Sequence, residues 1–212
     1  MKLIIVRHGE TDYNVKGLIQ GQRDTMLTEN GIKQTKALAE FFREKKIDVI
    51  YSSPLVRALD TAKIINEFHD ASLIISLNLK ERSFGEHEGK LGIDLDSELK
   101  GCLKDPYFTP KNGENTLHVM ERIRLFLDEL IDKYQSTSKV VMIVGHKVVN
   151  LCLIGSLLGW SIENLYSEKL HSTSFTTIEI DKDGNSELID FDDTSHLDKG
   201  GLSKVEEVEG IC

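Results

Sequence analysis

Four short, mostly apolar runs, separated by longer segments with helical periodicity, constrain the fold of this chain more than any other feature. The runs are rich in β-branched residues and show no alternation of polar and apolar positions, which is typical of strands buried on both faces. They occupy residues 3–6, 48–51, 73–75 and 140–144. Strands that alternate with helices form a mostly parallel sheet covered on both faces. We therefore expect an α/β protein with the architecture of a three-layer α/β/α sandwich.

The segments between these strands divide into predicted helices and irregular stretches. Helices are expected to begin at Thr28 or Asn30, and at Ser53 as an N-cap with Pro54 in the first helical position. Two more are expected over residues 117–134 and 148–158. Residues 9–27 are expected to form a long loop, and residues 81–114 an irregular segment with at best a short helix near 94–100. Residues 175–180 and 187–191 alternate around a turn, which predicts a hairpin that adds an antiparallel edge to the sheet.

The composition limits the classes of function. With 40% apolar and 29% charged residues, the 212-residue chain has the composition of a soluble globular protein. Its net charge of -9 argues against binding to nucleic acid or to an anionic membrane, both of which need a basic face. No apolar run is long enough to span a membrane, and the N-terminal run is too short for a signal peptide. Cys102, Cys152 and Cys212 are far apart, which favours reduced thiols and a cytoplasmic location.

Each predicted parallel strand is followed by an ionisable side chain. Arg7 and His8 follow the first strand directly, and Arg57 lies in the first turn of the helix after the second strand. Glu81 comes several residues after the third strand, and His146 follows the fourth almost directly. In sheets of this kind, ligands bind beyond the carboxyl ends of the strands. These five residues are therefore expected to converge at one edge of the sheet.

Such a set is suited to phosphoryl transfer. Two guanidinium groups can hold a phosphoryl group, and a neutral imidazole can attack phosphorus to form a phosphohistidine. A carboxylic acid can protonate the leaving alkoxide, and a second imidazole, protonated, can add to the electrostatic clamp. Two histidines and a glutamate could instead hold zinc. Arg7 and Arg57 would place fixed positive charges beside that cation, so we expect neither a metal nor another cofactor.

The motifs around these residues resemble those of the histidine phosphatase superfamily, which also contains cofactor-dependent phosphoglycerate mutases. The resemblance covers about residues 2–197 and begins with the run Arg7-His8-Gly9-Glu10-Thr11. Several blocks match in the order typical of the family: residues 3–14, 20–31, 52–62, 79–89, 112–115 and 193–197.

The resemblance implies a role for each site residue. His8 is expected to be phosphorylated, Glu81 to be the proton donor, and a phosphate-binding set to hold the phosphoryl group; this set comprises Arg7, Asn14, Gln20, Gly21, Arg57, His146 and Lys147. Lys147 departs from the family, which commonly has glycine after the second histidine. Its side chain could restrict the approach of the backbone to phosphate, add a cation at a helix N-terminus suited to anions, or simply lie on the surface.

The resemblance leaves open a mutase and a binding module without catalysis. Family mutases have Gly-Trp where this chain has Gly21-Gln22, and Arg-His-Tyr-Gly where it has Arg82-Ser83-Phe84-Gly85. The middle segment is also shorter than is typical of mutases, and all five residues of the site are present, which argues against a binding module. We therefore expect a metal-independent phosphomonoester hydrolase acting on a small phosphorylated metabolite, such as α-ribazole phosphate, a sugar phosphate or a phosphoglycerate.

The expected organisation is one catalytic domain over residues 1–197, followed by an acidic C-terminal tail over residues 198–212. Residues 86–114 match the family least and are expected to form the segment that determines substrate specificity. The protein is expected to be a monomer or a homodimer.

Overall fold

The computed structural model describes residues 1–95, 97–199 and 202. Within them, six strands form one sheet in the order β3-β2-β4-β1-β5-β6. The strands are β1 (Lys2–Arg7), β2 (Val49–Ser52), β3 (Ser72–Ile75), β4 (Val140–Gly145), β5 (Phe175–Ile180) and β6 (Ser186–Asp193). The first four strands are parallel, and β5 and β6 run antiparallel at one edge. The mostly parallel sheet and its antiparallel C-terminal edge are therefore confirmed.

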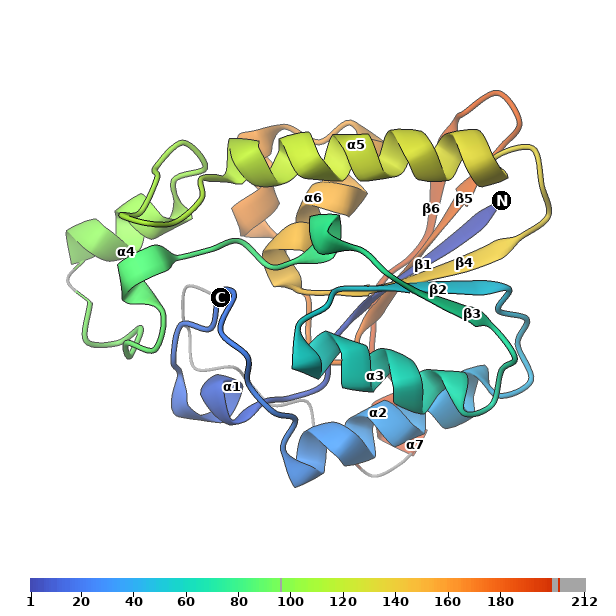
Figure 1. The fold of residues 1–212 in the computed structure, drawn as a ribbon, viewed down its shortest axis with the longest axis horizontal. Helices are drawn as coiled ribbons and strands as arrows, with labels where there is room; N and C mark the ends of the chain where they lie inside the picture. The colour runs from blue at the N-terminus through green and yellow to red at the C-terminus, as the bar shows by residue number, and fades with distance from the viewer. Residues whose placement is uncertain (96, 200–201, 203–212) are drawn as a thin grey trace.

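Helices cover both faces of this sheet (Figure 1). The α-helices are α1 (Asp12–Lys16), α2 (Glu29–Phe42), α3 (Val56–Asn66), α4 (Ser97–Lys104), α5 (Thr116–Tyr134), α6 (Lys147–Leu158) and α7 (Ser195–Lys199). Short 3-10 helices are η1 (Leu77–Leu79), η2 (Gly85–His87) and η3 (Ile162–Ser167). The helices α5 and α6 lie on one face, and α2 and α3 on the other (Figure 1). No helix in the described part of the chain is long and apolar enough to cross a membrane.

Consecutive residues of β1 supply two separate hydrophobic cores. Leu3 and Ile5 belong to the core beneath α5 and α6, whereas Ile4 and Val6 belong to the core beneath α2 and α3. Successive side chains of a strand point to opposite faces of the sheet, so a strand covered on both sides needs apolar residues at every position. This burial explains the uninterrupted apolar runs and confirms the three-layer sandwich.

The predicted loop over residues 9–27 contains a short helix, so this part of the prediction is wrong. Thr11 caps α1 by accepting a hydrogen bond from the Asn14 amide, and the Asn14 side chain accepts one in return from the Thr11 amide, which completes a capping box. Gly17 ends the helix in the left-handed conformation at φ 67°. Five residues are too few to show an apolar periodicity, so only the cap residues could have indicated this helix.

The predicted start of the helix after β2 is also wrong. The helix α3 begins at Val56, after Leu55, and not at Pro54 after a Ser53 cap. The Ser53 hydroxyl lies 2.8 Å from His146 Nε2, and the amide of Val56 donates to the Asp24 carboxylate at 3.0 Å. A residue from a distant loop therefore bonds to the first amide of the helix, and the Ser53 hydroxyl, which accepts from the Leu55 amide at 3.3 Å, also bonds to a candidate site residue.

The other predicted elements are found with small shifts. Thr28 caps α2 through the Gly31 amide, as one of the two expected starts, and α5 and α6 each begin one residue before their predicted ranges. The short helix expected near 94–100 is α4, at Ser97–Lys104. The predicted hairpin is formed by β5 and β6. The predicted acidic tail begins within α7, and most of it lies outside the described residues.

Candidate active site

His8 and His146 face each other at the carboxyl ends of two neighbouring strands. Arg7 is the last residue of β1 and pairs with Gly145, the last residue of β4, so the histidine after each strand lies at the same level. The ring centroids are 5.2 Å apart and the rings are tilted by 58°. Both side chains are almost fully buried. The convergence predicted from the strand ends is therefore present for these two residues.

Hydrogen bonds define the protonation of His8. Its Nδ1 atom lies 2.7 Å from the carbonyl oxygen of Gly9, an acceptor only, so Nδ1 carries the proton. Its Nε2 atom accepts a hydrogen bond from Arg57 Nε at 3.3 Å and therefore holds a lone pair. Burial lowers the pKa of His8 well below its usual value, and the nearby charges of Arg57 and Arg7 lower it further. His8 thus presents a neutral, unprotonated Nε2, the form that a nucleophile needs.

This assignment predicts the nuclear magnetic resonance spectrum of the imidazole. A lowered pKa means that His8 remains neutral as the pH falls through the ordinary histidine value near 6.5. In a long-range ¹H–¹⁵N spectrum at pH 6, we expect Nδ1 of His8 to be protonated and Nε2 to be unprotonated. A cationic imidazole at pH 6, or a proton on Nε2, would contradict the assignment.

The Arg57 guanidinium lies inside the site because backbone carbonyl groups hold it there. Its Nη1 donates to the carbonyl of Arg23 at 2.8 Å and its Nη2 to the carbonyl of Gly21 at 2.7 Å. Burial is the main cause that lowers its pKa to about 10, so it remains a cation at neutral pH. Gly21 has φ +52°, and a Cβ atom there would lie 2.1 Å from the Glu88 carboxylate. Glycine is therefore required where this loop wraps around Arg57.

A conservative replacement of Arg57 is expected to be damaging. Lysine keeps the positive charge, but its donors share one nitrogen and cannot replace Nε, Nη1 and Nη2 of Arg57, which bond to His8 and to two carbonyl groups from separate positions. Removing one preorganised donor typically costs about 10²–10³ in rate, and we expect a loss of that size in kcat for Arg57→Lys with p-nitrophenyl phosphate. The measurement is steady-state kinetics, with the melting temperature recorded to show that the variant is folded. Near wild-type turnover would show that Arg57 does not bind the reacting group.

Arg7 supplies the second cation of the site. The side chain is 2% exposed, and Nη1 donates to the carbonyl of Leu170 at 2.6 Å. The charge of Arg7 lowers the pKa values of His8, Arg57 and His146. Arg7 is therefore close enough to interact electrostatically with all three residues. The acidic protein therefore concentrates two fixed positive charges in one buried place, which suits a dianionic phosphoryl group.

The surroundings of His146 favour its neutral form, and protonation of this imidazole beside a bound phosphoryl group stays a prediction. Burial lowers its pKa well below the usual value, and Arg57, His8 and Arg7 lower it further. Its Nε2 bonds to the hydroxyl of Ser53. Its Nδ1 is buried and has no hydrogen-bond partner among the described residues. That atom is available to a phosphoryl oxygen.

Glu81 reaches the same place from the segment that follows β3. Its Oε1 accepts hydrogen bonds from the amides of Arg82 at 2.8 Å and Val149 at 3.2 Å, and its Oε2 accepts one from the amide of Val148 at 3.2 Å. Two of these donors belong to the first turn of α6, directly after His146. A helix N-terminus attracts an anion through its free amides. Here the protein's own carboxyl group occupies them, so Glu81 is fixed beside His146.

The remaining predicted phosphate-binding residues occupy different positions. Thr11 connects Asn14 and Gln20, whose amide oxygens lie 2.8 and 2.9 Å from its hydroxyl group, and both side chains are buried. Gly21 contacts Arg57 through its carbonyl oxygen. Lys147 is the first residue of α6 and is half-buried. The α6 amides of Val148 and Val149 are bonded to Glu81, so they do not form the free anion site considered for this helix start.

Several residues that hold the site together were not predicted from the sequence. The hydroxyl of Thr61, one turn after Arg57 on α3, accepts a hydrogen bond from the Gly9 amide at 3.1 Å and so fixes the backbone next to His8. The carboxylate of Glu114 and the guanidinium of Arg122 bond to the segment that carries Glu81. Thr61 and Glu114 lie in motifs of the family, but Arg122 lies in a helix whose pattern shows only an apolar face. No local signal identifies it.

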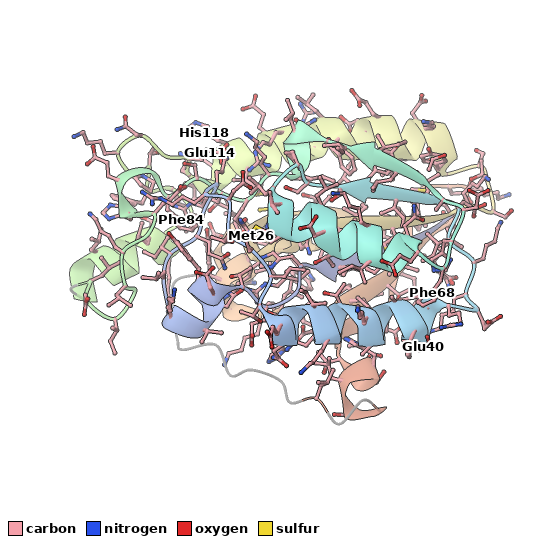
Figure 2. The ribbon with its side chains drawn as sticks, turned by 60° about the horizontal axis from the view of Figure 1, so that its bottom comes forward. Met26, Glu40, Phe68, Phe84, Glu114 and His118 are labelled. Carbon is pink, nitrogen blue, oxygen red and sulfur yellow. The ribbon has the colours of Figure 1, made fainter. Side chains whose placement is uncertain are left out.

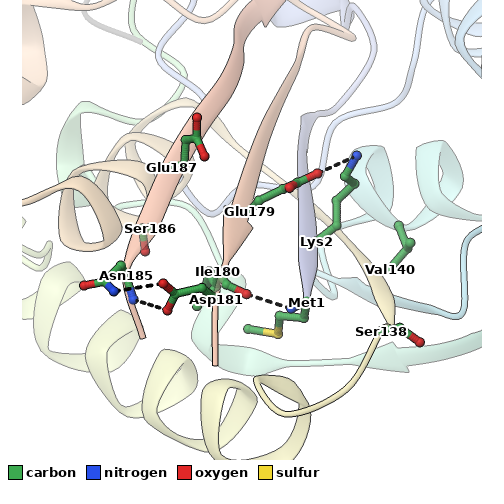
Figure 3. A pocket seen from close by; sticks show the side chains of 10 residues that line it. All are labelled: Met1, Lys2, Ser138, Val140, Glu179, Ile180, Asp181, Asn185, Ser186 and Glu187. Carbon is green, nitrogen blue, oxygen red and sulfur yellow. Dashed lines mark hydrogen bonds and ion pairs between the residues drawn. The ribbon is translucent and has the colours of Figure 1, made fainter. Parts of the chain in front are cut away.

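No metal-binding cluster competes with this site among the residues that the structure describes. In residues 1–95, 97–199 and 202, no group of three histidine, cysteine, aspartate or glutamate side chains could hold a metal ion. A hollow of about 460 Å³ lies at the opposite end of the sheet, beside Met1 and Lys2 (Figure 3). Several of its charged groups bond to the protein itself: Lys2 pairs with Glu179, and the N-terminal amino group donates to the Ile180 carbonyl.

Comparison with known proteins identifies the family. The sequence profile of the histidine phosphatase superfamily (branch 1) matches residues 3–192. The adenosylcobalamin/alpha-ribazole phosphatase of Salmonella typhimurium is 34% identical over 185 residues, which are 85% of this chain and 91% of that protein. Phosphoserine phosphatase 1 of Hydrogenobacter thermophilus is 30% identical over 93% of this chain and 94% of its own length. This chain belongs to the histidine phosphatase superfamily.

Solved structures agree with this assignment. A phosphoserine phosphatase mutant from Entamoeba histolytica, in complex with phosphoserine, superposes with a TM-score of 0.81 at 32% sequence identity. The match covers 92% of this chain and 98% of the other. The likeness thus extends over nearly the whole length of both proteins.

Proposed function

We propose that this protein is a phosphomonoesterase that hydrolyses a small phosphorylated metabolite through a phosphohistidine on His8. The observation that carries the proposal is the neutral Nε2 of His8, which is buried between the Arg57 guanidinium and the His146 ring. The relatives named above are phosphatases of small phosphate esters, which supports the same reaction class. Residues 1–197 would form the catalytic domain, with residues 86–114 determining which ester enters.

The first half of the reaction transfers the phosphoryl group to the protein. His8 Nε2 attacks phosphorus as the bond between phosphorus and the leaving oxygen breaks. Arg7 and Arg57 stabilise the charge on the equatorial oxygens, and Nδ1 of His146 lies free to bond to one of them. The protonated carboxyl group of Glu81 gives its proton to the leaving oxygen, so the product departs as an alcohol.

The second half returns the protein to its starting state. The Glu81 carboxylate accepts a proton from a water molecule as the water oxygen attacks the phosphohistidine. The bond between phosphorus and Nε2 breaks, inorganic phosphate leaves, and Glu81 is again protonated for the next cycle. The same residue thus acts first as an acid and then as a base, and no metal takes part.

The bulk properties support a small-molecule substrate and a location in the cytoplasm. The net charge of -9 is unfavourable for nucleic acid and for anionic membranes. The sparse, widely separated cysteines are typical of a reducing compartment, and Cys152 is a buried free thiol.

Hydrolysis and isomerisation can be separated by one set of assays. We expect turnover of p-nitrophenyl phosphate in excess EDTA, and release of phosphate from at least one member of a panel of phosphorylated metabolites that includes phosphoserine and α-ribazole phosphate. Interconversion of phosphoglycerates in the presence of their bisphosphate should be slower than hydrolysis. Loss of activity on chelation would overturn the metal-free mechanism, and mutase turnover above hydrolysis would overturn the phosphatase assignment.

A further inference from the structure

An ion pair lies behind the segment that carries Glu81. Glu114 precedes α5 and Arg122 lies within that helix; the position of Glu114 near His118 at the start of α5 is visible in Figure 2. Arg122 Nη2 is 3.3 Å from Glu114 Oε2, and Arg122 Nε donates to Glu114 Oε1 at 3.3 Å. The side chains are 16% and 25% exposed, so the pair is largely shielded from water.

Both partners bond to the backbone on either side of Glu81. Arg122 Nη1 donates to the carbonyl of Asn78, and Arg122 Nη2 donates to the carbonyl of Glu81 itself at 3.2 Å. Glu114 Oε2 accepts a hydrogen bond from the amide of Ser83 at 3.0 Å, and the Glu114 amide donates to the carbonyl of Ser83 at 2.9 Å. The pair therefore fixes residues before, at and after Glu81 in the chain.

Gln22 extends this arrangement toward the phosphate site. Its Nε2 atom donates to the carbonyl of Glu81 at 3.0 Å and lies 3.3 Å from Glu114 Oε2. Gln22 follows Gly21, whose carbonyl binds Arg57. The segment that carries the acid is thus connected by hydrogen bonds to the loop that wraps around the phosphate-binding arginine.

We propose that Glu114 and Arg122 are positioning residues that hold Glu81 at the place where it exchanges a proton with the ester oxygen. The proposal rests on the proposed role of Glu81 as the general acid. Neither side chain forms a hydrogen bond with His8, Arg57 or His146, and both bond instead to the backbone of the acid segment. The charge of Arg122 also lowers the pKa of His146, so Glu114 is the residue whose replacement tests the positioning role. A displacement of about 1 Å in a reacting group can cost on the order of 10² in rate, which is why such a group needs fixed supports.

The leaving group of the substrate gives a readout that a merely structural role would not change. The aryloxide group of an aryl phosphate leaves without a proton, whereas the alkoxide group of an alkyl phosphate needs one. For Glu114→Ala we expect kcat/KM with an alkyl phosphate such as β-glycerophosphate to fall by about 10- to 100-fold. This quantity reports the transfer to His8 and not the later hydrolysis, in which Glu81 is the base for every substrate. With p-nitrophenyl phosphate, kcat/KM should change by less than about threefold, so its dependence on the pKa of the leaving group should become steeper, as for Glu81→Gln.

A double variant tests whether the two residues act in the same step. Residues that act as a unit show strongly non-additive effects. Adding Glu114→Ala to Glu81→Gln should therefore cause little further loss with the alkyl phosphate. Arg124 and Asp128 provide a matched control, because they form an ion pair on the same helix α5 at 3.4 Å but are 69% and 62% exposed. Asp128→Ala should leave the dependence on the leaving group unchanged.

The possible outcomes separate this proposal from the proposed function. Equal losses of kcat/KM with both substrates in Glu114→Ala, or full additivity with Glu81→Gln, would overturn the positioning role while leaving Glu81 as the acid. If Glu81→Gln itself lowers kcat/KM of both substrates equally, the acid assignment fails, and the positioning role fails with it. Should Glu114→Ala not fold, Glu114→Gln and Arg122→Lys keep most of the volume and are subject to the same criterion.

Discussion

Replacing His8 with alanine is expected to abolish turnover of every phosphomonoester that the protein accepts. The variant retains Arg7, Arg57 and His146, so a phosphate ester can still bind, but no atom is left to attack phosphorus. Removal of the nucleophile from another enzyme with a covalent intermediate costs on the order of 10⁶ in kcat, and we expect a loss of at least about 10⁴ here. The measurement is kcat for p-nitrophenyl phosphate and for an alkyl phosphate, on protein whose melting temperature is also recorded.

Binding and chemical rescue provide the controls for His8→Ala. Inorganic phosphate should still inhibit proteolysis or raise the melting temperature of the variant, because the guanidinium groups remain. Imidazole added to the buffer can enter the vacated volume and take up the phosphoryl group, so partial recovery of turnover is expected. Activity of the variant within about tenfold of the unmodified protein would refute nucleophilic catalysis by His8.

Replacing Glu81 with glutamine is expected to produce a loss that depends on the substrate. The amide keeps the shape of the carboxyl group but has no acidic proton to give to the leaving oxygen. General acid catalysis contributes typically about 10²–10⁴ in rate, and kcat/KM for an alkyl phosphate, which reports the transfer to His8, should fall by that factor. For p-nitrophenyl phosphate, whose leaving group needs little protonation, kcat/KM should be much less affected.

The contrast between these substrates is the decisive result for Glu81. Its carboxyl group accepts backbone hydrogen bonds from α6, so glutamine could also disturb the start of that helix. Such a disturbance would reach His146 and lower turnover of both substrates alike. Equal losses of kcat/KM, which reports only the transfer to His8, would therefore show that Glu81 supports the site without acting as the acid. A matched loss of stability, measured by thermal unfolding, would identify that alternative directly.

The architecture could be predicted from the sequence because buried strands require a pattern of apolar residues that can be recognised in the sequence. A strand covered on both faces needs consecutive apolar residues, as in Leu3, Ile4, Ile5 and Val6, and this pattern does not depend on distant parts of the chain. The parallel order of the strands then places the residues at their carboxyl ends together. For the same reason, the proximity of His8 and His146 followed from the positions of β1 and β4 alone.

Features that depend on distant partners could not be predicted. The start of α3 differs because Asp24 caps the Val56 amide and Ser53 bonds to His146, and neither partner is close in sequence. The lowered pKa of His146 results from burial beside the cations of the site, which its neighbours in sequence do not reveal. The part played by Arg122 depends on where α5 packs. Long-range contacts determined each of these features, whereas local patterns determined the strands.

The most direct test of the account is to trap and locate the phosphorylated intermediate. The protein should be mixed with a ³²P-labelled ester, quenched in base within milliseconds and analysed by mass spectrometry under alkaline conditions, where phosphohistidine is stable. We expect a single acid-labile phosphoryl group on Nε2 of His8, which is absent from His8→Ala and accumulates when hydrolysis of the intermediate is slowed. A phosphoryl group on any other residue, or turnover by direct attack of water without a phosphorylated protein, would contradict it.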